Sequence, residues 1–561
     1  MGEEKRVIIY NQNKKQKLVL FVAIFIMCLV MLFFINQKEG YHADEIFSYG
    51  SSNSRYENIF WSYREKTPMH HLIEEKIFQD GNIFDWIGRI KYFFIDHKEE
   101  KDKFINQKIS EEEMIWRTSK EAEEYMKAGN NRFNYMSVYY NQVQDVHPPL
   151  FYAVVHTVSS IFYNSFSKYI IFFINLPFFI MVCILIWKIL NLLGKEKISI
   201  LGVILYGMSV GGISSMMFLR MYMMLTFFTV LFLYINLKII KSNMMVDKKS
   251  RIMLTLVPIL GFLTQYFFAI YAFLVFIIMI ILFIKKQEYK QMKRYISSIV
   301  ISAIIGIFIF PFSIGHMLWS DRGVSSFEKG NIVLRILKYF NLVLTYFGSK
   351  WEILTAFLVI AIFANMINKR NRSSENAIIF IPTIIFIIMV SYLAEYIELR
   401  YVMNMLPIIA IMITVSISSI FENEKYNEII AVIAVLLLIG YGFIKEKPLY
   451  LYKGYNNYIE ISERYKEDDL VYVGYTFFNH MQSMPEFMNY RKTLMIYNDQ
   501  LDFINQEDEL KDKDEFILSV NWSMNPEQTV EDVLRISGFS NYEMIYYGCD
   551  EIEQTIYRIY K

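Results

Sequence analysis

The sequence has few cysteines, almost no net charge and no glycine-rich nucleotide-binding loop, and each absence excludes a class of protein. Only three of its 561 residues are cysteine. Cys28 and Cys183 lie in long apolar segments and Cys549 lies near the C-terminus, which leaves neither a disulfide framework nor the paired spacing of a zinc site. The formal net charge of +1 gives no electrostatic reason to expect nucleic acid as a partner. The C-terminal part has no P-loop, so nothing there indicates a nucleotide-binding loop.

Apolar residues are abundant instead. The chain is 54% hydrophobic and 17% aromatic, with a mean hydropathy of +0.26, which is too apolar for a soluble protein and indicates a polytopic membrane protein. Strong apolar runs fall near 18–35, 168–192, 198–217, 221–240, 252–265, 267–284, 295–313, 351–367, 377–395, 401–420 and 428–444. These runs predict a mainly α fold with about eleven transmembrane helices in the lipid bilayer of the cell.

Lysine and arginine clusters between the runs predict the orientation. The clusters lie at 195–197, 241–251, 285–294 and 369–372. The positive-inside rule puts them in the cytoplasm with the N-terminus, so that eleven crossings leave the C-terminus outside. Two further apolar stretches, 331–347 and 150–164, carry polar residues at helical spacing, and we expect them to be interfacial helices.

The composition changes at about residue 448. Residues 1–447 are predicted to form the transmembrane domain, with 36–148 as its first outer loop. Residues 448–561 alternate helical segments with five short β-rich runs, at 470–475, 493–497, 515–520, 542–547 and 555–560, which predicts a small extracytoplasmic α/β domain. The outer face would then hold 36–148, the turns at 217–221 and 264–268, the 314–330 loop with His316, and 395–401.

Acidic residues follow the first apolar run. Asp44 and Glu45 lie just beyond it, and Asp145 and His147 precede another apolar helix. A carboxylate at the membrane boundary costs solvation energy unless something pairs with it or uses it. Ordinary interfacial polar residues are the alternative for each acid taken alone. Because two such sites occur on one face, we expect them to form the reaction centre.

Arg220 and Arg400 lie at outer helix ends. If the substrate is a lipid-linked phosphosugar, its leaving group is a lipid phosphate, which needs cations at the interface. Arginine makes forked, permanently charged contacts with phosphate. The attacking hydroxyl needs a base, which a carboxylate beyond a helix end supplies. Snorkelling of each arginine to the interface is the alternative.

Five short segments together resemble a known family. They are Ala43-Asp44-Glu45, Asp145-Val146-His147-Pro148-Pro149-Leu150, Arg220-Met221-Tyr222, Leu263-Thr264-Gln265-Tyr266-Phe267 and Leu399-Arg400-Tyr401. Their combination resembles the GT-C superfamily of integral-membrane glycosyltransferases that use polyprenyl-phosphate sugars, in the style of the protein O-mannosyltransferases and the bacterial aminoarabinose transferases. The resemblance covers roughly 18–420, and its Asp-Glu and His-Pro-Pro elements are the most specific.

The resemblance implies a GT-C type fold and a role for each motif residue. Asp44 would be the base, with Glu45 and Asp145 orienting the acceptor or holding a cation. The substrate-binding residues would be His147, Arg220, Tyr222, Gln265, Tyr266, Arg400 and Tyr401, with the two arginines on the donor phosphate. The family often has histidine where this chain has Gln265, which removes a possible ligand. The acids and His147 still offer ligands to Mn²⁺ or Mg²⁺, so metal-dependent and metal-free chemistry both stay open.

The expected function is an inverting glycosyltransferase that moves a sugar from an undecaprenyl-phosphate-type donor to an acceptor on the outer face. The sugar and the acceptor (a glycan, a lipid or a protein) are not indicated. A flippase or transporter of lipid-linked saccharides is the rival, but its ionisable groups should lie near mid-membrane within repeated halves, and no repeat is visible. A receptor is a third hypothesis, and the chain has no cytoplasmic output domain to support it.

Overall fold

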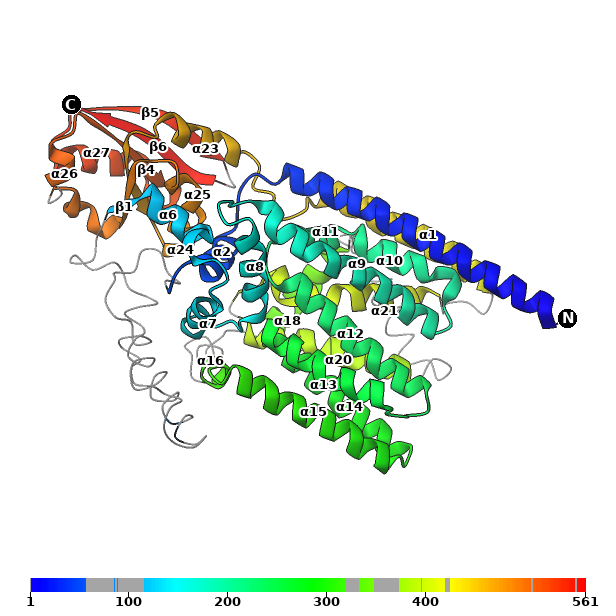
Figure 1. Ribbon diagram of the computed structural model, residues 1–561. Helices are drawn as coiled ribbons and strands as arrows, with labels where there is room; N and C mark the ends of the chain where they lie inside the picture. The colour runs from blue at the N-terminus through cyan, green and yellow to red at the C-terminus, as the bar shows by residue number, and fades with distance from the viewer. Residues whose placement is uncertain are drawn as a thin grey trace. The chain divides into compact units, whose positions relative to one another are not determined.

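A computed structural model describes residues 2–56, 85, 88, 116–318, 332–347, 373–394, 396–418, 424–505, 508–549 and 552–561. These residues form a mainly helical chain with one six-stranded sheet (Figure 1). The chain divides into two compact units: Met1–Ile35 with Ile171–Leu449, the helical unit, and Asn36–Ile170 with Tyr450–Lys561, the mixed unit. The residues of the first outer loop group with the C-terminal part of the chain rather than with the helices.

The helical unit is built from long apolar helices. In chain order they are α1 (Gly2–Gln37), α9 (Lys168–Leu192), α10 (Ser199–Gly207), α11 (Val210–Met217), α12 (Tyr222–Lys241), α13 (Lys248–Thr264), α14 (Phe267–Lys285), α15 (Tyr289–Ile309), α16 (Ser313–Leu318), α18 (Ile332–Tyr346), α20 (Ser374–Leu393), η7 (Leu399–Met405), α21 (Leu406–Ile417) and α22 (Glu424–Lys445). Within the described residues, eight helices are long and apolar enough to cross a membrane, and the bent pair α10–α11 makes a ninth if it forms one span. The expectation of a multi-pass, mainly α membrane protein is confirmed.

Three of the eleven predicted spans differ from the rest. α13 has 17 residues, about 26 Å of helix, which is at the lower end of what crosses the hydrocarbon core. The run at 351–367 lies outside the described residues. The run at 198–217 is broken into α10 and α11, which are bent by 54°.

The break between α10 and α11 follows from two small residues. Ser209 adopts an extended conformation, and its side chain accepts a hydrogen bond from Gly212 N at 3.0 Å, so it caps the second helix. A Cβ on Gly212 would lie 2.0 Å from the carbonyl oxygen of Tyr206. Only glycine therefore permits this close return of the backbone.

The stretches expected at the interface are both helices. α8 (Leu150–Ile161) has 12 residues, about 18 Å, which is too short to span. In α18, Arg335 donates hydrogen bonds to the carbonyl oxygens of Ser391 and Ala394. These carbonyls belong to the C-terminal end of α20, so part of the predicted polar stripe caps a neighbouring helix.

The sheet of the mixed unit has the strand order β1-β3-β2-β4-β6-β5. Its strands are β1 (Trp116–Thr118), β2 (Asp469–Gly474), β3 (Lys492–Tyr497), β4 (Glu515–Asn521), β5 (Asn541–Cys549) and β6 (Ile552–Tyr560). The central strands β3, β2 and β4 are parallel, and the outer pairs are antiparallel. All five predicted C-terminal strands form, and the first outer loop adds β1, which the sequence analysis does not predict.

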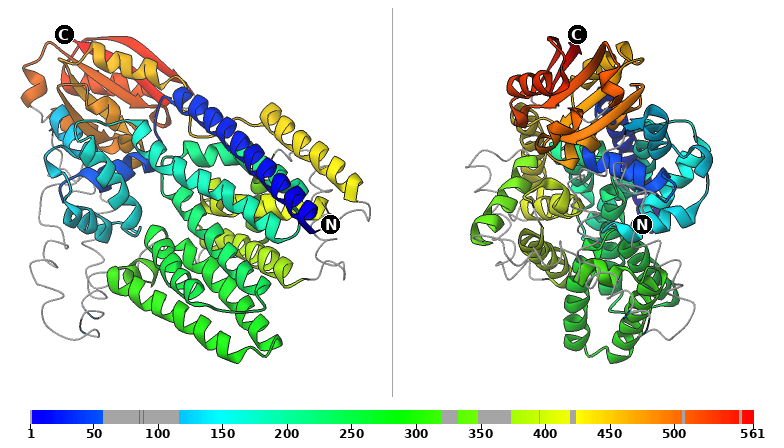
Figure 2. Two further views of the ribbon diagram at one scale, coloured as in Figure 1. Left: turned by 45° about the vertical axis from the view of Figure 1, so that its right-hand side comes forward. Right: turned by 90° about the vertical axis from the view of Figure 1, so that its left-hand side faces the viewer.

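Helices cover both faces of this sheet (Figure 2). On one face, Val530 and Val533 of α27 (Pro526–Ser537) join the core formed by the apolar strand residues. On the other face, Tyr472 of β2 packs against Phe487 of α25 (Met484–Phe487), which lies next to α23 (Tyr455–Arg464). Burial on both faces explains why β2 has no polar–apolar alternation.

The same unit contains the helix that carries the predicted base. α2 (Ala43–Asn53) packs against α6 (Ser119–Met126), α7 (Tyr135–Gln144), α8 and α24 (Phe477–Gln482). A Cβ on Gly50 would lie 2.0 Å from Cζ of Tyr125 in α6, so glycine is needed at this crossing. At the far end of α2, Asn141 and Asn131 donate to the carbonyl oxygens of Ser51 and Asn53 at 3.2 and 3.0 Å.

Candidate functional site

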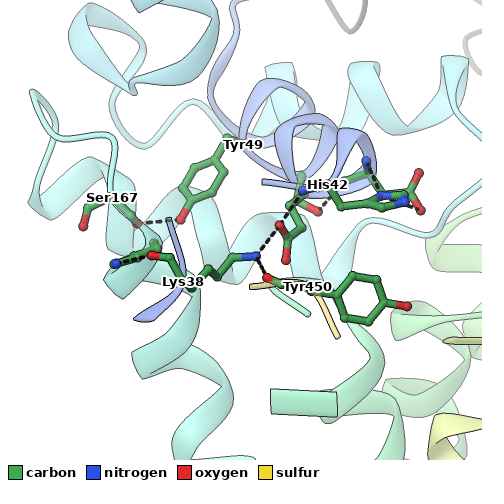
Figure 3. A network of polar contacts seen from close by, with 9 residues as sticks. Lys38, His42, Tyr49, Ser167 and Tyr450 are labelled. Atoms are coloured by element: carbon green, nitrogen blue, oxygen red, sulfur yellow. Dashed lines mark hydrogen bonds and ion pairs between the residues drawn. The ribbon is translucent and has the colours of Figure 1, made fainter. Parts of the chain in front are cut away.

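The start of α2 is held by a buried ion pair. Lys38 Nζ lies 2.9 Å from Glu45 Oε2, and neither side chain has any exposed surface. Lys38 also donates to the carbonyl oxygen of Tyr450, and Glu45 Oε2 accepts the backbone N–H of His42 at 2.8 Å (Figure 3). Glu45 therefore completes a capping box rather than facing a substrate. The predicted role of Glu45 in orienting an acceptor does not fit its complete burial.

Asp44, the adjacent residue, has a different environment. Its side chain is 18% exposed, and its backbone N–H donates to His42 Nδ1 at 3.0 Å. Because Nδ1 is the acceptor, a neutral His42 carries its proton on Nε2. Asp44 lies in the first turn of α2, where the helix dipole favours an ionised carboxylate. The structure thus separates two neighbouring acids into a buried structural group and an accessible one.

Asp145 and His147 form the second predicted pair, and they are in contact. Asp145 Oδ2 lies 2.8 Å from His147 Nδ1, with side-chain exposures of 28% and 13%. Asp145 caps the C-terminal end of α7, and Pro149 precedes the first residue of α8. The two prolines restrict the backbone between these helices. The contact with Asp145 orients the His147 ring.

In the helical unit, Arg220 lies in the short turn between α11 and α12 and is 2% exposed. Its backbone N–H donates to Phe218 O at 2.8 Å, and its carbonyl oxygen accepts from Asn175 Nδ2 of α9 at 3.3 Å. The rings of Phe218 and Tyr222 stack, with centroids 5.5 Å apart. Packing on both sides therefore fixes the backbone that carries Arg220.

Arg400 at the start of η7 has a partner that the sequence analysis does not predict. Its Nε lies 2.9 Å from Glu398 Oε2, and its Nη2 donates to Glu398 Oε1 at 3.2 Å. The guanidinium also lies 5.2 Å from the centroid of the Tyr401 ring. Because the Arg400 side chain is only 10% exposed, Glu398 compensates a charge that would otherwise be costly to bury.

The turn between α13 and α14 contains Gln265 and Tyr266. Gln265 Oε1 accepts the backbone N–H of Phe267 at 2.6 Å, so this side chain caps the start of α14. Tyr266 Oη lies 2.9 Å from Nδ1 of His316 in α16, and His316 is 4% exposed. The sequence analysis puts His316 on the outer face but not in the site, since no local pattern marks a partner fifty residues away.

The helical unit brings its predicted segments together. η7 packs against α11 and α12, the two helices that flank Arg220. The ring of Tyr401 in η7 lies 5.8 Å from that of Phe267, next to the Gln265 turn. Three segments that are far apart in the sequence therefore surround one region of this unit.

A shared metal site does not form from the predicted ligands. Among the residues that the structure describes, no group of three or more histidine, cysteine, aspartate and glutamate side chains is placed to hold a metal ion. Glu45 forms a buried ion pair with Lys38, and Asp145 contacts His147. These contacts do not fit the alternative in which Asp44, Glu45, Asp145 and His147 together ligate one cation.

Comparisons with known proteins give structural likeness only. No protein-family model matches the chain, and no curated protein matches it. It is similar to two crystal structures of ArnT from Cupriavidus metallidurans. The structure bound to undecaprenyl phosphate matches with a TM-score of 0.47 and 9% sequence identity. The structure in the apo state matches with a TM-score of 0.45 and 10% sequence identity. Each match covers 73% of this chain and 87% of the ArnT chain. The function proposed below rests on the residues of this chain.

Proposed function

We propose that the chain is an inverting glycosyltransferase that moves a sugar from a polyprenyl-phosphate donor to an acceptor hydroxyl on the outer face of the membrane. The observation that carries the proposal is the difference in exposure between the two adjacent acids at the start of α2. Glu45 is fully buried against Lys38, whereas Asp44 stays accessible on a helix that is fixed at both ends. A rigidly held, accessible carboxylate is what a general base requires.

In the proposed reaction, Asp44 accepts the proton of the acceptor hydroxyl as its oxygen attacks the anomeric carbon of the donor. The bond from that carbon to the phosphate oxygen breaks, and the configuration at the carbon is inverted. The polyprenyl phosphate leaves with the bonding electrons as a phosphate monoester. It needs cationic stabilisation rather than a proton donor.

Arg220 and Arg400 supply that positive charge in our proposal. Arg400 uses two of its five guanidinium donors on Glu398, which orients the group without exhausting its hydrogen-bonding capacity. Tyr222 and Tyr401 each lie against an aromatic or cationic neighbour near these arginines and line the donor site. Gln265 and Tyr266 shape the adjacent turn through their contacts with Phe267 N and His316.

We assign the Asp145–His147 pair to the acceptor. Asp145 holds Nδ1 of His147 and so orients the ring in the segment between α7 and α8, both of which pack against α2. Through this contact, Asp145 is a positioning residue. The roles assigned here belong to side chains alone, since the described residues contain no group of three or more potential metal ligands.

The test is a transfer assay on the detergent-solubilised chain with a panel of polyprenyl-phosphate sugars. Wild type should release polyprenyl phosphate and glycosylate an acceptor. Asp44→Asn keeps the shape but removes the proton acceptor, so transfer should fall by about 10²–10⁴-fold while donor binding survives. Asp512→Asn, at an exposed position of the mixed unit, is the matched control and should keep full activity.

Two outcomes contradict the proposal. Transfer by Asp44→Asn within about threefold of wild type would remove Asp44 as the base. A wild-type chain that moves lipid-linked sugar across vesicles without cleaving it would instead support the flippase alternative.

A further inference from the structure

A cavity of about 370 Å³ lies within the mixed unit, and none of the residues assigned a role above lines it. It is bounded by the residue before α2, by α23 and α24, and by the adjoining ends of β4 and β6. Its volume falls at the small end of the range for ligand pockets, about 300–1,000 Å³. The space is therefore sufficient for a small ligand rather than a protein segment.

The lining is aromatic and rich in amides. Four tyrosines contribute to the wall: Tyr452, Tyr455, Tyr458 and Tyr472. Residues with amide side chains, such as Gln482 and Gln554, also line the cavity. Tyrosine presents an apolar ring with a polar tip, and an amide both donates and accepts hydrogen bonds. A sugar ring has complementary chemistry, with an apolar C–H face and a rim of hydroxyls that also donate and accept.

Much of the aromatic wall is fixed before any ligand enters. Tyr472 Oη accepts from Gln554 Nε2 at 2.7 Å and from Ser483 Oγ at 2.9 Å, and it donates to the carbonyl oxygen of Asn479 at 3.1 Å. Tyr455 Oη donates to the carbonyl oxygen of Gln482 at 3.0 Å. Such a saturated network holds the rings in place, which lowers the entropic cost of binding.

Two lining side chains remain available for a ligand. Within the described part of the chain, the side chains of Gln482 and Glu553 make no hydrogen bond, although the backbone carbonyl oxygens of both accept one. Both residues line the cavity, and Gln482 is partly exposed while Glu553 is exposed. They are the groups that would form hydrogen bonds with the hydroxyls of a bound sugar.

The charge of the lining selects against anions. Glu553 is an acidic residue of the lining, and none of the described residues that line the cavity is lysine or arginine. A phosphate or an acidic glycan would therefore find no compensating cation among them. We therefore do not assign the phosphate of the donor to this cavity.

We propose that this cavity binds an uncharged saccharide. His42 both lines the cavity and caps α2 two residues before Asp44. A saccharide held against His42 lies at the start of the helix that carries the base, so we identify it as part of the acceptor. The residues that line the cavity support saccharide binding by themselves. The identification of the saccharide as the acceptor rests on the proposed function.

Binding is measured first, on the full chain in a detergent without a sugar headgroup, because a maltoside would compete. Saturation-transfer NMR with uncharged N-acetylglucosamine and mannose oligomers, and with sialyllactose as the anionic probe, should show contact only for uncharged probes. Gln482→Ala should weaken binding about three- to tenfold, the effect of removing one or two hydrogen bonds. Gln528→Ala, at an exposed position of α27 outside the cavity, should change nothing.

The transfer assay then identifies the source of the saccharide. We expect Gln482→Ala to raise the acceptor KM about three- to tenfold with the donor KM unchanged. A raised donor KM would overturn the acceptor assignment. Absence of binding by every uncharged probe at millimolar concentration, or equal binding in Gln482→Ala, would overturn the saccharide site even if the chain transfers sugar. Binding without transfer would support the site while rejecting the proposed function.

Discussion

At the scale of single residues, neighbours in the sequence have separate roles because helix geometry points them apart. Successive residues of a helix are about 100° apart, so Asp44 and Glu45 cannot share one environment. Glu45 faces Lys38 in the interior, and Asp44 keeps a partly exposed side chain. The acidic pair that marks this site in the sequence therefore contains one structural and one accessible carboxylate.

Arg400 gives a prediction at the same scale. Arg400→Ala should raise the donor KM roughly tenfold to more than a hundredfold, because a charge-assisted contact with phosphate is worth about 1.5–3 kcal/mol. Arg400→Lys should recover only part of this loss, since an ammonium group cannot form two parallel hydrogen bonds with Glu398 or with phosphate. Steady-state kinetics at varied donor concentration measure the effect.

Arg335→Ala is the control for loss of an arginine from the same unit. Arg335 caps the carbonyl groups at the end of α20, so its removal should reduce stability but leave the donor KM near wild type. A donor KM that is unchanged in Arg400→Ala, or raised equally in both variants, contradicts a specific phosphate contact.

At the scale of elements, α2 is the helix on which the proposed site depends. Its first turn is held by Lys38, Glu45 and His42, and its last turn by asparagine side chains from neighbouring segments. Lys38 binds the carbonyl oxygen of Tyr450 as well, which ties the start of the C-terminal segment to the same turn. The accessible carboxylate thus depends on contacts made by residues that never meet a substrate.

Breaking the buried pair should loosen α2. Lys38→Met leaves Glu45 buried without its cation and should cost about 3–5 kcal/mol, as is usual for a lone buried charge. The double variant Lys38→Met with Glu45→Gln should recover a substantial part of that loss, because no charge remains buried. Amide hydrogen exchange within Ala43–Asn53 measures the change. A single variant that protects α2 as well as wild type would show that the pair is dispensable.

The buried carboxyl group of Glu486 in α25 should make the free energy of unfolding depend on pH. Burial raises the pKa of this carboxyl group to about 8, although a hydrogen bond with Tyr458 acts in the opposite direction. The folded state therefore binds the proton more tightly than the unfolded chain, whose pKa is near 4.5. The stabilisation is complete below that value and is lost as pH rises towards 8, by about 1.4 kcal/mol per unit.

The measurement is thermal unfolding of the full chain between pH 6.5 and 8.5. This window avoids His480, whose pKa is lowered by burial to about 4 and which destabilises the fold only in acid. Wild type should lose thermal stability across the window, and Glu486→Gln should lose less. Glu531→Gln, an exposed control in α27, should follow wild type. Parallel curves for wild type and Glu486→Gln would contradict the raised pKa.

At the scale of the whole molecule, the topology predicted from charge can be tested with two serines. Ser242 follows α12, which ends in a lysine-rich turn, and Ser523 follows β4; both are exposed. In a chain with its three cysteines replaced by alanine, Ser523→Cys should react with a membrane-impermeant maleimide in intact cells, and Ser242→Cys only after lysis. Labelling of both positions from outside would refute the predicted orientation.

The apolar runs and the lysine-rich loops are local properties, and they were sufficient to predict the helices, the multi-pass architecture and the five C-terminal strands. Helix and strand periodicity depend on near neighbours in the chain, so such elements can be predicted from short windows. The candidate acids and arginines were also recognisable, because charges at the ends of apolar helices are conspicuous in any window.

Their partners depend on the tertiary structure. β1 joins the sheet from a segment more than three hundred residues before β3, Lys38 reaches Tyr450, and Tyr266 meets His316. No short window contains both members of such a pair. Burial separates the two acids as well, since an accessible carboxylate is available for the proposed role of base, whereas one that is buried against a lysine is a structural anion. Folding therefore decided which of two adjacent acids, Asp44 and Glu45, is available for chemistry.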